Sequence, residues 1–272
     1  MLSRSALSTL FLLTGTLAPC AIQAGDQKLG VEGTAFVLTL ADGRVLRGAD
    51  LVGAELDLGD GREVRIDAVR ADPGDPSGET LLHSLSVRTA GSEWQSACEP
   101  DREGRREGFP LSGRWNDDGR MHDDPSRFFL TCTGGAQAKC VRFGYKPWKQ
   151  AADGASLQPL YEACVHMARA DYCGDGVPST REGTTIDIYD EHGVQTSESG
   201  PEFRFEAGWA PTGAVCVAHT RIPENLTLEA LRQKCPRLAP LLGEACTEES
   251  AKRLGAVLFN KSRQDIRTRY PI

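Results

Sequence analysis

Apolar and polar residues alternate along the chain between residues 31 and 97. A period of two is typical of strands that bury one face. It predicts strands over residues 35–40, 44–46, 55–58, 63–69 and 81–87. Asp42-Gly43 and Asp60-Gly61 lie between strands, and glycine supplies the positive φ that tight hairpins need. We therefore expect a small antiparallel β barrel or sandwich over residues 25–97.

A helical period replaces the alternation at residues 157–168. Apolar side chains recur three and four residues apart, at Leu157, Leu160, Tyr161, Cys164 and Ala168. This stripe predicts an amphipathic helix with Cys164 facing the core. Ser156 is placed to cap its start, and Gly174 to end it in the left-handed conformation. His166 falls about half a turn away, on the expected polar face.

The rest of the chain mixes both patterns. We expect strands over residues 184–189, 202–205 and 214–220, helices over 226–234 and 247–258, and a polar tail after them. With the β-rich start, these elements predict an α+β protein whose second domain covers residues 98–272.

The first 24 residues look like a secretory signal peptide. Arg4 precedes an apolar run at residues 6–17 that is too short to span a bilayer. Cleavage is expected after Ala24. The alternative is a lipoprotein with lipid on Cys20, although Pro19 is a poor residue before the modified cysteine. No later segment is long and apolar enough to predict a membrane span.

Export changes the interpretation of the cysteines. Cys20 lies in the leader, and the other eight are Cys98, Cys132, Cys140, Cys164, Cys173, Cys216, Cys235 and Cys246. An even number in an exported chain predicts disulfides that reinforce the second domain. The sequence leaves their pairing open. Cys235 and Cys246 are close enough along the chain to suggest one bridge around Pro236 and Pro240.

Charge excludes some partners. The formal net charge is −7, whereas nucleic acids and anionic membranes are bound by clustered Lys and Arg. We therefore expect neither as the main partner.

Several short blocks of the second domain carry a family resemblance. They lie at residues 131–135, 138–142, 144–148, 163–167, 169–176, 205–209 and 213–216. In this order they resemble the bacterial exported proteins called ADYC-domain proteins, after the motif that stands here as Ala170, Asp171, Tyr172 and Cys173. The resemblance implies a secreted or envelope protein, commonly a lipoprotein, and supplies no catalytic residues.

A cysteine–histidine hydrolase built on Cys173 and His166 is disfavoured by geometry. Seven residues of continuous helix would separate the two by about 10 Å, whereas a competent pair lies within about 3 Å. On strand 214–220, His219 and Cys216 would face opposite sides of a sheet. Asp171 and Asp175 are expected to hydrogen-bond the backbone of their own turn.

A polar cluster over residues 116–124 could offer oxygen ligands to a metal ion. It contains Asn116, Asp117, Asp118, His122, Asp123 and Asp124. Their spacing matches no known ligand loop, so we interpret the cluster as a solvated loop.

Five aromatic residues have two interpretations. Trp94, Trp115, Trp148, Trp209 and Tyr145 could form an exposed platform for sugars or peptides. Packing in the core or between domains is the more ordinary role for such side chains.

The sequence therefore predicts an exported, disulfide-stabilised envelope protein, secreted or periplasmic, that acts as a non-enzymatic binding module for a protein, peptide or glycan. The alternative is an exported hydrolase with a site formed by Asp171, Asp175, His166 and His219. No motif indicates a metal or cofactor. The motif residues of unassigned role are Ala170, Asp171, Tyr172, Cys173, Gly174, Asp175 and Gly176.

Overall fold

The computed structural model describes residues 28–58, 61–115, 120–122, 124 and 126–263. The expected leader, with Cys20 and the cleavage site after Ala24, lies outside the described residues. So do Asn116, Asp117, Asp118 and Asp123 of the polar cluster. Within the described part of the chain, no helix is long and apolar enough to cross a membrane, and no three His, Cys, Asp or Glu side chains are grouped to hold a metal ion.

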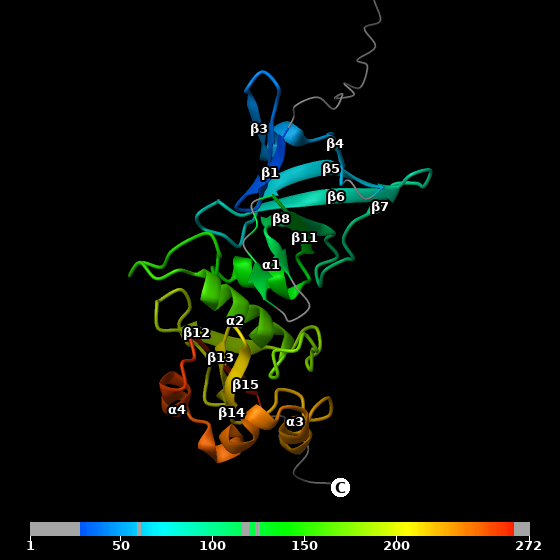
Figure 1. The fold of residues 1–272 in the computed structure, drawn as a ribbon. Helices are drawn as coiled ribbons and strands as arrows, with labels where there is room; N and C mark the ends of the chain where they lie inside the picture. Colours follow the sequence, from blue (N-terminus) through cyan, green and yellow to red (C-terminus); the bar gives the residue numbers. More distant parts are fainter. Residues whose placement is uncertain (1–27, 59–60, 116–119, 123, 125, 264–272) are drawn as a thin grey trace, which may run out of the picture.

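Two antiparallel sheets form the N-terminal part of the fold (Figure 1). The first has the order β1-β2-β3, with β1 at Lys28–Glu32, β2 at Ala35–Thr39 and β3 at Val45–Arg47. The second runs β11-β8-β6-β5-β4, with β7 beside β6. Its strands are β4 Glu55–Asp57, β5 Arg62–Ala71, β6 Leu81–Thr89, β7 Gln95–Ser96, β8 Glu107–Ser112 and β11 Phe128–Cys132. A 3-10 turn, η1 at Gly48–Leu51, and the pair β9 Arg114–Trp115 and β10 Met121–His122 complete this part.

The alternating pattern explains which face of these strands is buried. Val64 and Ile66 on β5 are fully buried, and Arg65 between them points outward. Their side chains join Phe36 and Leu85 in one apolar cluster. Strands β2 to β6 were thus predictable, but the described residues form several sheets and no closed barrel. The expected division at residue 98 falls inside the second sheet, because β8 pairs with β6, which precedes that residue, and β11 pairs with β8.

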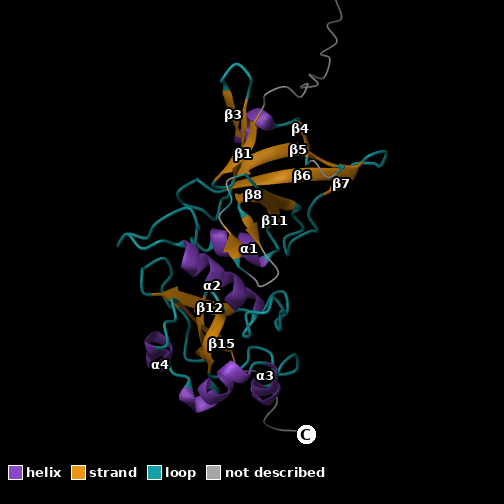
Figure 2. Cartoon of the chain, viewed as in Figure 1, coloured by secondary structure: helices purple, strands orange, loops and turns teal. Residues whose placement is uncertain are grey.

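Helices lie between the N-terminal sheets and a third sheet (Figure 2). They are α1, Ala136–Arg142, and α2, Gln158–Arg169. The third sheet has the order β12-β15-β13-β14. Its strands are β12 Ile186–Asp190, β13 Phe203–Ala210, β14 Gly213–Val217 and β15 Leu258–Arg263. The remaining elements near this sheet are α3 Leu228–Lys234, the 3-10 turns η2 Pro236–Leu241 and η3 Gly243–Ala245, and α4 Glu248–Arg253.

One apolar core joins the parts. It contains Leu82 and Phe109 from the second sheet, Leu160 from α2, and Trp209 and Leu258 from the third sheet. Because α2 is covered on both sides, it has no solvated face at His166. The expectation that His166 lies on a polar face is wrong, since its side chain is 1% exposed.

Ion pairs and hydrogen bonds also connect the helical layer to the sheets on either side. Arg142 at the end of α1 binds Asp72, and the Lys146 ammonium lies 2.8 Å from the Asp75 carboxylate. Tyr145 points the other way and donates to Asp190 at 2.9 Å. The segment after α1 therefore contacts both the loop before β6 and the end of β12.

The five aromatic residues do not share a platform. Trp209 and Tyr145 are fully buried. Trp115 packs edge-on against Tyr161, and the indole of Trp94 lies against two arginines of the second sheet. Trp148 is 40% exposed.

All eight cysteines of the described residues are paired. The bonds are Cys98–Cys132, Cys140–Cys164, Cys173–Cys235 and Cys216–Cys246. Cys164 faces the core as predicted. The expected Cys235–Cys246 bridge is wrong, because Cys235 at the end of α3 faces the turn after α2, while Cys246 faces β14.

A buried histidine predicts how the stability of the fold depends on pH. His83 on β6 is fully buried beside Phe36, and neither ring nitrogen has a hydrogen-bond partner among the described residues. Burial lowers its pKa to about 4. Between pH 6.5 and 4 the unfolded chain therefore binds a proton that the folded chain does not. We expect acidification over this range to lower the free energy of unfolding by about 3 kcal/mol through this residue.

Urea unfolding at pH 7 and pH 4 checks this expectation. His83→Phe should lose that part of the pH dependence, whereas His192→Gln, at a partly exposed histidine paired with Asp153, should retain it. An equal fall in His83→Phe and in the unaltered chain would contradict the assignment.

Candidate functional site

The turn that follows α2 contains the motif residues 170–176, which we call the ADYC turn. The helix ends at Arg169, four residues before Cys173, so Gly174 does not end it as expected. Ala170 takes the left-handed conformation instead, with φ 49° and ψ 42°. Among the described residues it is the only non-glycine with positive φ. Because this conformation strains a residue with a Cβ, its surroundings must hold it. Ser179 does so by donating from Oγ to the Ala170 carbonyl at 2.6 Å.

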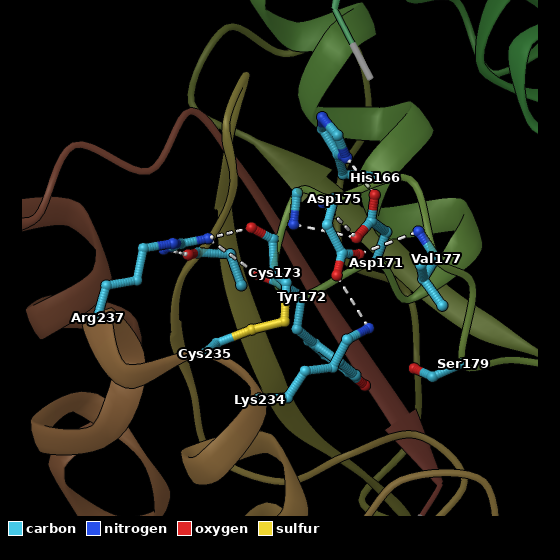
Figure 3. The surroundings of a disulfide bond; sticks show 12 residues. His166, Asp171, Tyr172, Cys173, Asp175, Val177, Ser179, Lys234, Cys235 and Arg237 are labelled. Atoms are coloured by element: carbon cyan, nitrogen blue, oxygen red, sulfur yellow. Dashed lines mark hydrogen bonds and ion pairs between the residues drawn. A yellow bond between two sulfur atoms is a disulfide. The ribbon is translucent and has the colours of Figure 1, made fainter. Parts of the chain in front are cut away.

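The carboxylate of Asp171 organises the turn (Figure 3). Oδ1 accepts from the amides of Gly174 and Asp175 at 3.0 and 3.1 Å. Oδ2 accepts from the amide of Gly176 at 2.8 Å and from His166 Nδ1 at 2.9 Å. The side chain is 1% exposed. Asp171 thus fills the concavity formed by its own downstream amides, where an external anion would otherwise bind. The expected bonding of Asp171 to the backbone of its own turn is confirmed.

Both ring nitrogens of His166 face hydrogen-bond acceptors. Its Nδ1 faces the Asp171 carboxylate, and its Nε2 lies 3.1 Å from the carbonyl oxygen of Pro211. Both neighbours are acceptors, so the ring satisfies both only when each nitrogen holds a proton. Burial raises the pKa of Asp171, but the hydrogen bond and charge of His166, together with the backbone amides, outweigh burial and hold that pKa below its usual range.

Tyr172 turns into the core and meets a second buried ion pair. Its ring stacks on Trp209, and its hydroxyl donates to Glu206 Oε1 at 3.0 Å. Glu206 also binds the Arg221 guanidinium at 3.0 Å, and both side chains are almost completely buried. Burial raises the pKa of Glu206, but the charge of Arg221 outweighs it and keeps the pKa low. Arg221 Nη2 donates in addition to the carbonyl of Met167 at 2.8 Å, so this network caps the end of α2.

Two glycines allow the turn to touch the third sheet. Gly174 has φ +72°, and a Cβ built there would lie 2.1 Å from the carbonyl oxygen of Thr212. Gly213 has φ +103°, and a Cβ there would lie 2.7 Å from the Gly174 nitrogen. The two backbones therefore approach each other more closely than any side chain permits.

Cys173 and Asp175 connect the turn to α3 and η2 (Figure 3). The disulfide Cys173–Cys235 is the covalent connection. Asp175 is half-exposed and forms an ion pair with Lys234 at 3.1 Å; it also accepts from the amide of Val177, as expected. Arg237 donates to the carbonyls of Tyr172, Cys173 and Thr212 at 3.0 to 3.3 Å, and to Ala214 at 2.6 Å.

These contacts decide which chemistry the turn can perform. His166 and Asp171 are in contact but are closed to solvent, and the sulfur of Cys173 is oxidised. His219 is 8% exposed, and its ring nitrogens face the carbonyls of Thr220 and Arg204 at 3.3 and 3.4 Å. Within the described residues it makes no hydrogen bond to the other candidate groups. The four residues of the expected hydrolase site therefore do not converge on a solvent-accessible position.

Sequence reasoning missed Glu206, Arg221 and Arg237. Glu206 stands in a strand whose polar residues normally face solvent, and the two arginines lie in segments without periodicity. Nothing local to these residues indicates that they close on the ADYC turn.

Comparison with known proteins bears on the same residues. Searches of curated proteins and of solved structures found no match. The model of the ADYC domain family matches residues 48–223, which contain all of α2, the turn, Glu206 and Arg221. The match covers well over half of the chain and includes strands on both sides of residue 98. The chain therefore belongs to the ADYC domain family.

Proposed function

We propose that the chain is an exported, disulfide-stabilised protein of the bacterial cell envelope that binds a protein, peptide or glycan without catalysis. One observation carries the proposal. The groups of the ADYC turn that could perform chemistry, namely His166, Asp171 and Cys173, are all bonded within the protein. A catalytic group must reach the atom that reacts. The turn therefore serves the fold, and the outer surface is left to serve binding.

The covalent structure supports the compartment. Four disulfides are typical of chains that fold under oxidising conditions. In the proposal, residues 1–24 direct export and are removed after Ala24. Lipid attachment at Cys20 is the alternative outcome of the same processing.

A contact residue can be proposed from exposure. Trp148 is the aromatic residue among the exposed large apolar side chains of the described chain. One edge of its indole lies against the turn at Gly33, which holds the ring in place. An ordered, partly exposed indole offers area to a sugar ring or an apolar peptide side chain at little entropic cost.

The first experiment tests location. The full chain is produced in a bacterium with an intact envelope, fractionated, and its mature N-terminus determined. We expect it in the envelope or the medium, starting at Gly25, with no cysteine open to alkylation before reduction. A mature chain that starts at Cys20 with lipid indicates the lipoprotein. An uncleaved chain in the cytoplasm contradicts the proposed export.

The second experiment separates binding from hydrolysis. Purified peptidoglycan sacculi serve as the glycan probe, and lysine-reactive cross-linking in intact envelopes serves as the protein probe. We expect saturable binding to one probe, weakened by Trp148→Ala and unchanged in Leu254→Ala. Leu254 is a suitable control because it is 42% exposed on another element, at the end of α4. Release of soluble product that is lost in His219→Gln would overturn the proposal and favour the hydrolase.

A further inference from the structure

We propose that the disulfide between Cys173 and Cys235 is a redox-active site, which exchanges with an external dithiol while the fold stays intact. The inference concerns the corner where the ADYC turn meets the end of α3 (Figure 3). It does not depend on the proposed binding role.

Access is the first requirement of exchange, because the attacking thiolate must reach one of the two sulfurs. Cys140, Cys164 and Cys216 are 0% exposed, and Cys246 is 4% exposed. Two of the four disulfides are therefore closed. Cys173 and Cys132 are each partly exposed, so only the bonds Cys173–Cys235 and Cys98–Cys132 offer an accessible residue.

Charge distinguishes these two bonds. Arg237 donates four hydrogen bonds, two of them to the carbonyls of Tyr172 and Cys173 in the ADYC turn, the latter at 3.0 Å, and two to those of Thr212 and Ala214. All four acceptors are neutral carbonyls, and within the described residues Arg237 forms no ion pair. Burial lowers the pKa of Arg237, and the nearby charge of Asp171, which is not hydrogen-bonded to it, offsets this only in part. Its positive charge would be stabilised by a thiolate at Cys173, which favours the reduced state.

The other accessible bond lacks this feature. Arg106 donates to the carbonyl of Cys98 at 3.2 Å, but the carboxylate of Glu99 lies 3.6 Å from the same guanidinium. A thiolate at Cys98 would lie near a guanidinium, that of Arg106, which is already paired with a carboxylate. We therefore expect Cys173–Cys235 to be the more easily reduced of the two.

The corner also keeps non-covalent connections when the bond opens. Arg237 links η2 to the turn, and Lys234 at the end of α3 pairs with Asp175. Leu231 on α3 and Leu238 on η2 are fully buried in the main core. Since these contacts are independent of the sulfurs, the two segments remain together after reduction, and the thiols stay placed to re-form the bond.

The exchange follows ordinary thiol–disulfide chemistry. A thiolate of the external dithiol attacks Sγ of Cys173, and Cys235 leaves as a thiolate and takes up a proton. The second thiolate of the same external dithiol then attacks the dithiol sulfur that is bonded to Cys173 in the mixed disulfide, and Cys173 is released. The dithiol is oxidised to a disulfide by loss of two electrons, and the protein gains these electrons with two protons.

Titration of the folded full chain with dithiothreitol tests the order of opening. Samples are quenched with an alkylating agent and mapped by mass spectrometry, with circular dichroism recorded in parallel. We expect Cys173 and Cys235 to be modified first, at a dithiothreitol concentration about tenfold below that for the other six cysteines, with an unchanged spectrum. Earlier opening of Cys98–Cys132, simultaneous opening of all four bonds, or loss of the spectrum on opening would each overturn the proposal.

Two charge variants test the cause. Equilibration with glutathione should show Arg237→Gln shifted toward the disulfide by about three- to tenfold. Lys234→Gln is the matched control, because its charge is already neutralised by Asp175, and it should shift the equilibrium less than about twofold. Equal shifts in both variants would contradict the role of Arg237.

Two cysteine variants keep the test independent of whether Arg237→Gln folds. Cys235→Ser leaves Cys173 free, and Cys173→Ser leaves the buried Cys235 free. With oxidised glutathione as the probe, we expect Cys235→Ser to form the mixed disulfide about tenfold faster. Equal rates would overturn the assignment of Cys173 as the attacked sulfur.

Discussion

Replacing Asp171 by asparagine is expected to lower the free energy of unfolding by about 3 to 5 kcal/mol at pH 7, the range for removing one partner of a buried ion pair. The carboxylate is hydrogen-bonded to Nδ1 of His166 and also accepts from three backbone amides. Asparagine keeps the shape but supplies one acceptor oxygen in place of two. The buried Nδ1 of His166 then loses the carboxylate to which it is hydrogen-bonded. Equilibrium unfolding in urea measures the difference.

Asp175→Asn is the matched control. This substitution also removes one carboxylate charge, four residues further along the chain. The side chain of Asp175 is 41% exposed, however, and its partner is the partly exposed Lys234. Exposed pairs contribute about 0 to 1 kcal/mol, so a small loss is expected. Should the two variants lose equal stability, the central role given to Asp171 would be wrong.

The effect of Asp171→Asn also depends on pH. The pKa of Asp171 is held below its usual range in the folded protein. Its stabilising contribution is therefore complete above the unfolded-state pKa of about 4 and is lost as the pH falls through the folded-state pKa. The difference in unfolding free energy between the two chains should be greatest near neutral pH and should narrow in acid.

Gly174→Ala is expected to cost about 3 kcal/mol or more, from left-handed strain and from forced displacement of packed backbone. The new Cβ would stand 2.1 Å from the Thr212 carbonyl oxygen, so the turn and the start of β14 must separate. Separation weakens the hydrogen bond from the Ala214 amide to the Tyr172 carbonyl. It also weakens the hydrogen bonds that Arg237 donates to the carbonyls on both sides. Urea unfolding of the purified variant measures the loss.

Gly193→Ala isolates the steric part of this effect. Gly193 has φ +73°, nearly the value of Gly174, but a Cβ there meets nothing within 4 Å. It should therefore cost only the strain of the left-handed conformation, about 1 kcal/mol. A loss at Gly174 no greater than at Gly193 would show that the close approach of the two backbones does not matter.

These expectations give the family motif a physical meaning. Ala170 reverses the chain, Asp171 holds the turn, Tyr172 anchors it on the buried Glu206 and Arg221, and Cys173 ties it to α3. The four letters of the motif thus describe one structural unit.

Local patterns were sufficient where a segment contacts its surroundings through one face. Strands β4, β5 and β6 of the second sheet followed from alternation, and α2 followed from its apolar stripe, with Cys164 inward. The helix expected over residues 226–234 is present as α3, which begins two residues later, after Thr227 caps it by accepting from the amide of Ala230. In each case the period of burial matches the period of the backbone.

Local patterns failed where two sides of an element are covered. The polar stretch of β15 was expected to be a tail, yet the strand lies inside the third sheet between β12 and β13. Its Asn260 is fully buried and accepts from the indole of Trp209 at 2.8 Å. His166 was misplaced for the same reason, because its partner Asp171 lies beyond the end of the helix and Pro211 lies in the turn between β13 and β14.

By itself, then, the sequence determined the eight paired cysteines, the alternating strands, the helix before the motif and the family. Only the tertiary structure decided which cysteines pair, which histidine is buried against a carboxylate, and that Glu206, Arg221 and Arg237 contact the ADYC turn or its buried network. The physical reason is that hydrogen bonds, ion pairs and disulfides between distant segments depend on which backbone ends meet, and no local period encodes that meeting.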